Sequence, residues 1–237
     1  MREGLKAAKV VQTLERLHAR IRERFPDAGL TQVAQELVDI AKATSARARR
    51  VSEPFVLLRA AVGVVIVATI GLLGWVVIHS PLQNLTLSPD ITALAQGLNA
   101  VVNLLVIAAG STWFLMSLEQ RLKRRRALKD LHELRSFAHV IDMHQLTKDP
   151  TVVLSKQRTS SSPAREMTRF QLTRYLEYCA EMLALIGKLA ALYSEYTRDP
   201  QIVGAVNDVE NLSTDLGRKI WQKITILSDL DESQAKA

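Results

Sequence analysis

Two long apolar runs interrupt a chain that is otherwise rich in charge. Residues 55–78 contain a single charged residue, Arg59, and residues 93–118 contain none. About 20 apolar residues are enough for a helix to cross the hydrocarbon core of a bilayer. The pattern therefore predicts two transmembrane helices joined by residues 79–92. Arg59 comes one turn inside the first run, where a long side chain can reach the lipid headgroups.

Basic residues are concentrated at the outer ends of the two runs and are absent from the segment between them. Arg47, Arg49 and Arg50 precede the first run and the sequence RLKRRR at 121–126 follows the second, whereas residues 79–92 contain neither Lys nor Arg. The positive-inside rule then places both termini in the cytoplasm. We expect a multi-pass protein of the cell inner (plasma) membrane whose arginines contact anionic headgroups. The net charge of +7 is explained by these flanks, so we expect no nucleic-acid partner.

The sequences outside the apolar runs show the three- and four-residue spacing of amphipathic helices. The first of these helices ends at Phe25-Pro26 and forms a hairpin with the second. This hairpin packs on the C-terminal helices or lies on the membrane surface. Neither proline nor glycine occurs between residues 117 and 147, so the second transmembrane helix continues through this stretch. Asp199-Pro200 is a typical helix start. The expected helices cover residues 5–25, 31–48, 93–147, 167–197 and 200–228, with a linker at 148–166.

No strand pattern occurs, so the expected fold class is an all-α integral membrane protein. Its two-helix transmembrane hairpin carries an α-helical cytoplasmic bundle. The expected domains are an N-terminal helical hairpin at 1–50, a transmembrane hairpin at 51–118 and a C-terminal helical domain at 119–237.

Gln96, Asn99 and Asn103 form a polar stripe on the second apolar run. At 100° per residue they fall, with Thr92 and Gly110, within an arc of roughly 60°. Amides in hydrocarbon need hydrogen-bond partners, and the first run offers little beyond Thr69. We therefore expect a homo-oligomer in which the stripe either joins helices of different subunits or lines a pore.

The basic residues Arg121, Arg124 and Arg125 follow the stripe along the same helix. At 3.6 residues per turn the amide face also carries Arg121, Arg125, His132, Arg135 and His139, which would give a pore a basic, pH-sensitive vestibule. At the 3.5 residues per turn of a supercoil, the aligned face becomes apolar instead. The arginines then contact lipid headgroups, and the sequence leaves both arrangements open.

His132, His139 and Asp142 lie on one helical face together with Arg135, and this residue set suits a divalent metal. The two histidines are two turns apart, roughly 10 Å, so one ion would need ligands from another helix or subunit. Salt bridges and hydrogen bonds within the bundle are the other interpretation. This face carries the alternative function, a membrane-tethered cytoplasmic ligand- or metal-binding module.

Signatures of catalysis are missing from the sequence. It contains no phosphate-binding glycine loop, no Gly-x-Ser-x-Gly and no His-Glu-x-x-His. Cys179 is the only cysteine, which excludes an intrachain disulfide, and its apolar helical face predicts a buried thiol. We expect no enzyme and no cofactor. The leading prediction is a non-enzymatic, homo-oligomeric membrane protein that forms a channel-like or scaffold assembly.

Overall fold

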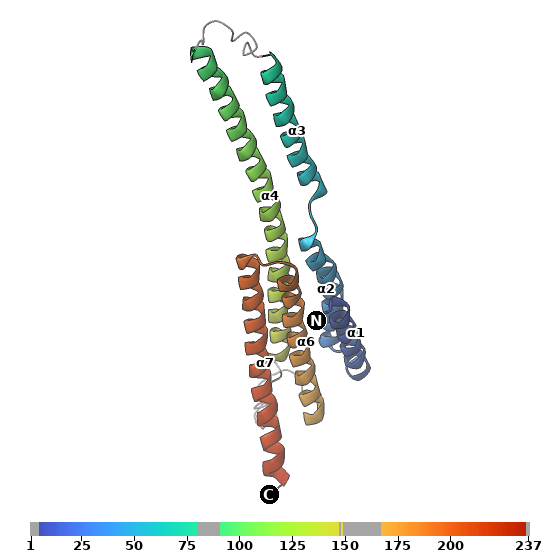
Figure 1. Ribbon diagram of the computed structural model, residues 1–237. Helices are drawn as coiled ribbons and strands as arrows, with labels where there is room; N and C mark the ends of the chain where they lie inside the picture. Colours follow the sequence, from blue (N-terminus) through green and yellow to red (C-terminus); the bar gives the residue numbers. More distant parts are fainter. Residues whose placement is uncertain (1–4, 80–90, 147, 149–166, 236–237) are drawn as a thin grey trace, which may run out of the picture. The chain divides into compact units, whose positions relative to one another are not determined.

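The computed structural model describes residues 5–79, 91–146, 148 and 167–235. These residues form helices and contain no strand, which confirms the all-helical prediction (Figure 1). The expected linker at 148–166 lies almost wholly outside the described residues, as does most of the connection at 79–92. The helices are α1 (Ala7–Arg24), α2 (Gly29–Ser52), α3 (Val56–His79), α4 (Ile91–Leu146), α6 (Arg169–Tyr196) and α7 (Pro200–Ala235).

The chain divides into two compact units. We call Met1–Ser52 together with Arg124–Ala237 the bundle unit, and Glu53–Lys123 the apolar unit. The bundle unit joins the N-terminal hairpin to the C-terminal helices, as expected for a helical bundle. The helix α4 contributes to both units, and its 56 residues confirm that the helix continues beyond the second apolar run.

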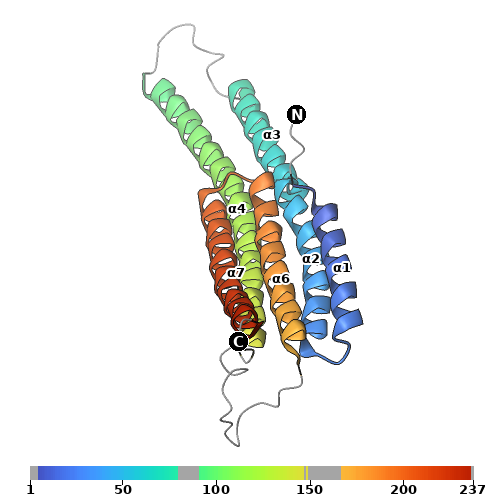
Figure 2. The same ribbon diagram turned by 90° about the horizontal axis from the view of Figure 1, so that it is seen from below.

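The core of the bundle unit is centred on α6. Figure 2 shows α6 between α2 and α7, and it contacts both of them as well as α1. The three- and four-residue spacing of apolar residues in 167–197 predicts one apolar side, which includes Leu176 and Leu183, and these residues are buried. The structure adds residues on the other sides of the helix. Also buried are Tyr175, Tyr178, Ala180, Met182, Leu185, Gly187, Leu189 and Leu192.

Cys179 lies within this core and is fully buried, which confirms the predicted buried thiol. Burial raises the pKa of the Cys179 thiol to about 12, because a thiolate is poorly solvated in an apolar interior. The side chain therefore acts as a small apolar group and not as a nucleophile.

The helices α1 and α2 form a hairpin that packs against α6 in the bundle unit. Their turn begins at Phe25, one residue before the proline, as predicted. The ring of Phe25 meets the rings of Tyr175 and Tyr178 edge-on, with centroids 5.7 and 6.3 Å apart. Thr31 Oγ1 donates to the Phe25 carbonyl at 2.6 Å. Of the two placements that the sequence left open, the structure therefore has the hairpin packed on the C-terminal helices.

The start of α7 is fixed by Asp199. Its carboxylate accepts a hydrogen bond from the backbone N–H of Gln201 at 2.9 Å, which confirms the predicted cap. Arg124 of α4 donates to the same side chain through Nε at 2.8 Å and Nη2 at 2.7 Å. Burial opposes ionisation of Asp199, but the hydrogen bonds from Arg124 and the backbone outweigh it, so the pKa of this carboxyl is lowered.

The apolar unit contains α3 and the first part of α4. Both helices are long and apolar enough to cross a membrane, and none of the residues in their most apolar stretches is buried. Glu119 of α4 accepts hydrogen bonds from the Phe55 backbone N–H at 3.2 Å and forms an ion pair with Lys123 at 2.9 Å. These contacts attach the start of α3 to α4.

We expect Asp199→Ala to destabilise the first turn of α7 by roughly 1–2 kcal/mol, because a cap and an ion pair are lost together. Backbone amide hydrogen exchange of residues 201–206 measures this opening. The lowered pKa of Asp199 means that its contribution is present above the unfolded-state pKa and is lost as the pH falls through the folded-state pKa.

Asp199→Asn retains a capping oxygen without the charge, so exchange in this variant should lose that acidic pH dependence. Asp208→Ala on the exposed side of α7 is the control and should leave exchange unchanged. Equal pH dependence in the wild type and Asp199→Asn would contradict the assignment.

Candidate functional site

The amide stripe is the first candidate site, and the structure places two of its three members one helical turn apart. Asn99 and Asn103 are exposed on α4. Asn103 Nδ2 donates to Asn99 Oδ1 at 3.4 Å. Gln96 belongs to α4, but its side chain lies outside the described part of the chain. The pair of asparagines is therefore the part of the stripe whose surroundings are defined.

Thr69 of α3 makes no hydrogen bond to these amides. Its hydroxyl donates to the carbonyl of Val65 within its own helix, at 2.7 Å. Among the described residues of the apolar unit, no hydrogen bond joins Asn99 or Asn103 to α3. Each side-chain amide offers two N–H donors and a carbonyl oxygen. One mutual contact at 3.4 Å thus leaves most of their hydrogen-bonding capacity unused within the chain.

The asparagines lie among exposed apolar side chains. On α4 these include Leu98, Val102, Leu105, Val106, Ile107, Trp113 and Phe114, and on α3 they include Val64, Val67, Ile70 and Trp75. Neither water nor hydrocarbon alone suits a surface that combines large apolar groups with two amides. The physical requirement is a polar partner presented within an apolar environment.

The three candidate basic residues fall into two groups. Arg121 and Arg125 are exposed. Arg124 is half-buried and forms the ion pair with Asp199 described above. Its guanidinium therefore connects α4 to the start of α7 in the bundle unit, a role that sequence reasoning did not assign to it. Only Arg121 and Arg125 present their charge outward.

The histidine face lies on the part of α4 that belongs to the bundle unit. His132, Arg135 and His139 are exposed, and Asp142 is half-buried. Asp142 accepts a hydrogen bond from Gln145 Nε2 at 2.6 Å. In the part of the chain that the structure describes, no three His, Cys, Asp or Glu side chains are grouped closely enough to hold a metal ion. A single chain therefore does not bring His132, His139 and Asp142 together as one site.

Gln145 has a structural role of its own. It is buried, and Lys223 of α7 donates from Nζ to its side-chain oxygen at 2.6 Å and to its backbone carbonyl at 3.3 Å. Asp142, Gln145 and Lys223 thus form a polar connection between α4 and α7. For Asp142 this supports the interpretation as a hydrogen-bonding residue of the bundle.

Sequence reasoning missed an ionic network around the buried Asp130. Asp130 is 6% exposed, and it accepts a hydrogen bond from Tyr193 Oη of α6 at 2.7 Å. Arg47 of α2 contacts the other Asp130 oxygen through Nη1 at 3.1 Å, and Glu133 through Nη2 at 3.1 Å. Burial and the bond to Asp130 raise the pKa of Tyr193 well above its ordinary value. Tyr193 therefore remains a donor throughout the physiological pH range.

One feature of the sequence could have indicated this network. Asp130 lies beside the apolar positions Ala127, Leu131 and Leu134, all of which are buried. An acidic residue next to a core-facing seam needs a partner from another helix, because an unpaired buried charge is costly. The pattern identifies the acid, but it does not indicate which helix supplies the base.

No family model matches this chain, and no curated protein or solved structure is significantly similar to it. The candidate sites therefore rest on geometry and residue chemistry alone.

We expect Tyr193→Phe to lower the free energy of unfolding of the bundle unit by about 1–3 kcal/mol, because a buried carboxylate oxygen loses its donor. Asp130→Ala should cost more, because Tyr193 and Arg47 then both lose their acceptor. Chemical denaturation followed by circular dichroism measures both changes.

Tyr196→Phe is the matched control, since the hydroxyl of this tyrosine makes no hydrogen bond to the described residues, and we expect a change within about 0.5 kcal/mol. If Tyr193→Phe were as stable as Tyr196→Phe, the network would not contribute to the stability of the bundle.

Proposed function

We propose that the protein is a non-enzymatic, homo-oligomeric membrane protein in which α3 and the first part of α4 cross the bilayer. The exposed apolar side chains of both helices support insertion, because a bilayer removes them from water at no cost in packing. The amide stripe of α4 then lies at the contact between subunits. The assembly acts as a scaffold, or as a channel if the amides surround an open path.

The observation that carries this proposal is the exposure of Asn99 and Asn103 on an otherwise apolar surface. In hydrocarbon, an unsatisfied amide costs several kcal/mol. The described residues of α3 provide no partner for these amides, so the same stripe on α4 of another copy is the simplest donor and acceptor surface. Amide contacts between transmembrane helices are worth about 0.6–2 kcal/mol each.

We place the amides in a closed helix contact in preference to an open pore. Arg124 would not contribute to a basic vestibule beside a pore, because its guanidinium is paired with Asp199. Polar side chains commonly join packed transmembrane helices without conducting ions. Conduction is the further property that a flux assay tests, and the scaffold function does not require it.

We further propose that the protein is a multi-pass inner-membrane protein with both termini in the cytoplasm. The support is the distribution of basic residues. Arginines 47, 49, 50, 121 and 125 lie at the outer ends of the apolar runs, and residues 79–92, which connect the runs, contain no Lys or Arg. Anionic headgroups are the natural partners for these charges.

We expect the protein in mild detergent to have the mass of a multimer by native mass spectrometry. Replacing both Asn99 and Asn103 by leucine should weaken association by roughly tenfold or more, since about 1 kcal/mol is lost per amide. Leu98→Ala with Leu105→Ala is the control, because both leucines are exposed on the side of α4 away from the amides.

A monomeric wild-type protein would overturn the proposal. If the amide variant associates as tightly as the wild type, the stripe is not part of the interface. Ion flux in proteoliposomes that is lost with the amides would identify the assembly as a channel.

The topology leads to a separate expectation for cysteine labelling in intact cells. A cysteine in place of Gln83 should react with a membrane-impermeant maleimide, whereas Ser194→Cys should react only after the cells are permeabilised. The native Cys179 is buried and provides the unlabelled background. Labelling of both positions from outside would contradict the orientation.

A further inference from the structure

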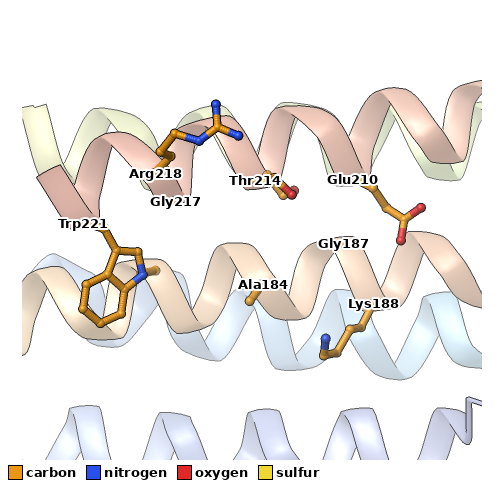
Figure 3. Close-up of a pocket in the computed structure, with 10 residues that line it drawn as sticks. Ala184, Gly187, Lys188, Glu210, Thr214, Gly217, Arg218 and Trp221 are labelled. Carbon is orange, nitrogen blue, oxygen red and sulfur yellow. The ribbon is translucent and has the colours of Figure 1, made fainter.

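A groove of about 500 Å³ runs between α6 and α7 in the bundle unit. Figure 3 shows it with residues of both helices along its sides. Small residues make up more than half of its lining, so α6 and α7 can approach each other closely. The lining residues are Ala180, Ala184, Gly187 and Lys188 of α6, and Glu210, Ser213, Thr214, Gly217, Arg218 and Trp221 of α7.

The exposure of Trp221 indicates that the groove is incomplete in a single chain. Trp221 is 56% exposed, and Figure 3 shows its indole extending from α7 toward α6 at one end of the groove. An exposed tryptophan is costly in water, and tryptophan is common where another molecule docks.

The charges of the groove indicate what docks. Lys188 and Glu210 lie at the opposite end from Trp221, on different helices (Figure 3). They are at a similar height, because a Cβ on the neighbouring Gly187 would lie 3.9 Å from the Glu210 Cα atom. The two sides therefore carry opposite charges at one level. A surface with this arrangement is complementary to a second copy of itself.

We propose that the α6–α7 groove binds the same groove of a second copy, related by a two-fold axis that runs along the two helices. In this arrangement α6 of each copy faces α7 of the other. The two-fold axis then produces two equivalent ion pairs, each between Lys188 of one copy and Glu210 of the other. The axis keeps both copies pointing the same way along these helices. This inference rests on the proposed self-association and adds to it a second contact in the bundle unit.

The same arrangement accounts for Trp221. The helices α6 and α7 run in opposite directions, so moving from Ser213 to Trp221 along α7 corresponds to moving from Gly187 back toward Ala180 along α6. The indole of each copy then packs on the small residues Ala180 and Ala184 of the other. A large side chain that meets alanines buries apolar area without a clash, as the central residues of interfaces do.

The first test is a charge exchange. Lys188→Glu and Glu210→Lys should each weaken association of the full-length protein on the order of tenfold, because each places like charges opposite one another twice. The double variant should recover most of the wild-type association. Asp208→Lys and Lys219→Glu are the matched controls, because both residues are exposed on α7 without lining the groove.

Cross-linking provides a second test that does not depend on folding energetics. One tagged chain carries Ala184→Cys and a differently tagged chain carries Thr214→Cys, and the two are co-expressed and treated with a short bis-maleimide. Each chain has one new cysteine, and native Cys179 is buried, so an intrachain product is excluded. We expect a covalent species that carries both tags, and none when Asp208→Cys replaces Thr214→Cys.

The outcomes separate this inference from the proposed function. If the protein is a multimer but gives no cross-link, and its association is unchanged in the charge variants, the groove contact is overturned. The proposed amide interface is unaffected by that outcome. A cross-link to a protein of another mass overturns the second copy as the occupant. A cross-link that persists after Asn99→Leu with Asn103→Leu supports the groove, and shows that it forms independently of the amides.

Discussion

The bundle unit depends on the burial of α6. This helix has buried residues on nearly all of its sides, so no single neighbour can cover it. The hydrophobic effect therefore draws helices that are distant in sequence around one central helix. The α1–α2 hairpin comes from the N-terminus, α4 continues from the second apolar run, and α7 follows α6 directly. Other features of the unit, including the Asp130 network and the α6–α7 groove, are consequences of which helices surround α6.

Polar groups on α4 meet two different conditions along the same helix. Asp130 is buried, and it is satisfied within the chain by Arg47 and Tyr193. Asn99 and Asn103 are exposed among apolar side chains and bond weakly to each other. The contrast follows from the number of neighbours, because α2 and α6 surround the first position and α3 offers little to the second. A polar group that its own chain does not satisfy favours association.

The two proposed contacts between copies lie in different units and use different chemistry. Amide contacts in hydrocarbon are directional and are favoured by the absence of water. The groove between α6 and α7 combines an aromatic anchor with two exposed charge pairs, which are individually weak and sensitive to salt. Joining two weak contacts in one chain increases the effective concentration for the second once the first has formed. Such coupling suits a scaffold whose assembly is reversible.

The sequence by itself determined the helices, because their signals are local. Periodic apolar positions, Phe25-Pro26, Asp199-Pro200 and the absence of helix breakers after residue 117 correctly predicted α1, α4 and the start of α7. The expected end of α7 at residue 228 was wrong, because the helix continues to Ala235. The amide stripe and the histidine face also follow from helical geometry. The tertiary structure decided which residues found partners. Arg124 pairs with Asp199, Asp142 bonds to Gln145 beside Lys223, and Asp130 meets Arg47 and Tyr193. These partners are far apart along the chain, so helical periodicity carries no information about them, and only the packing around α6 brings them together.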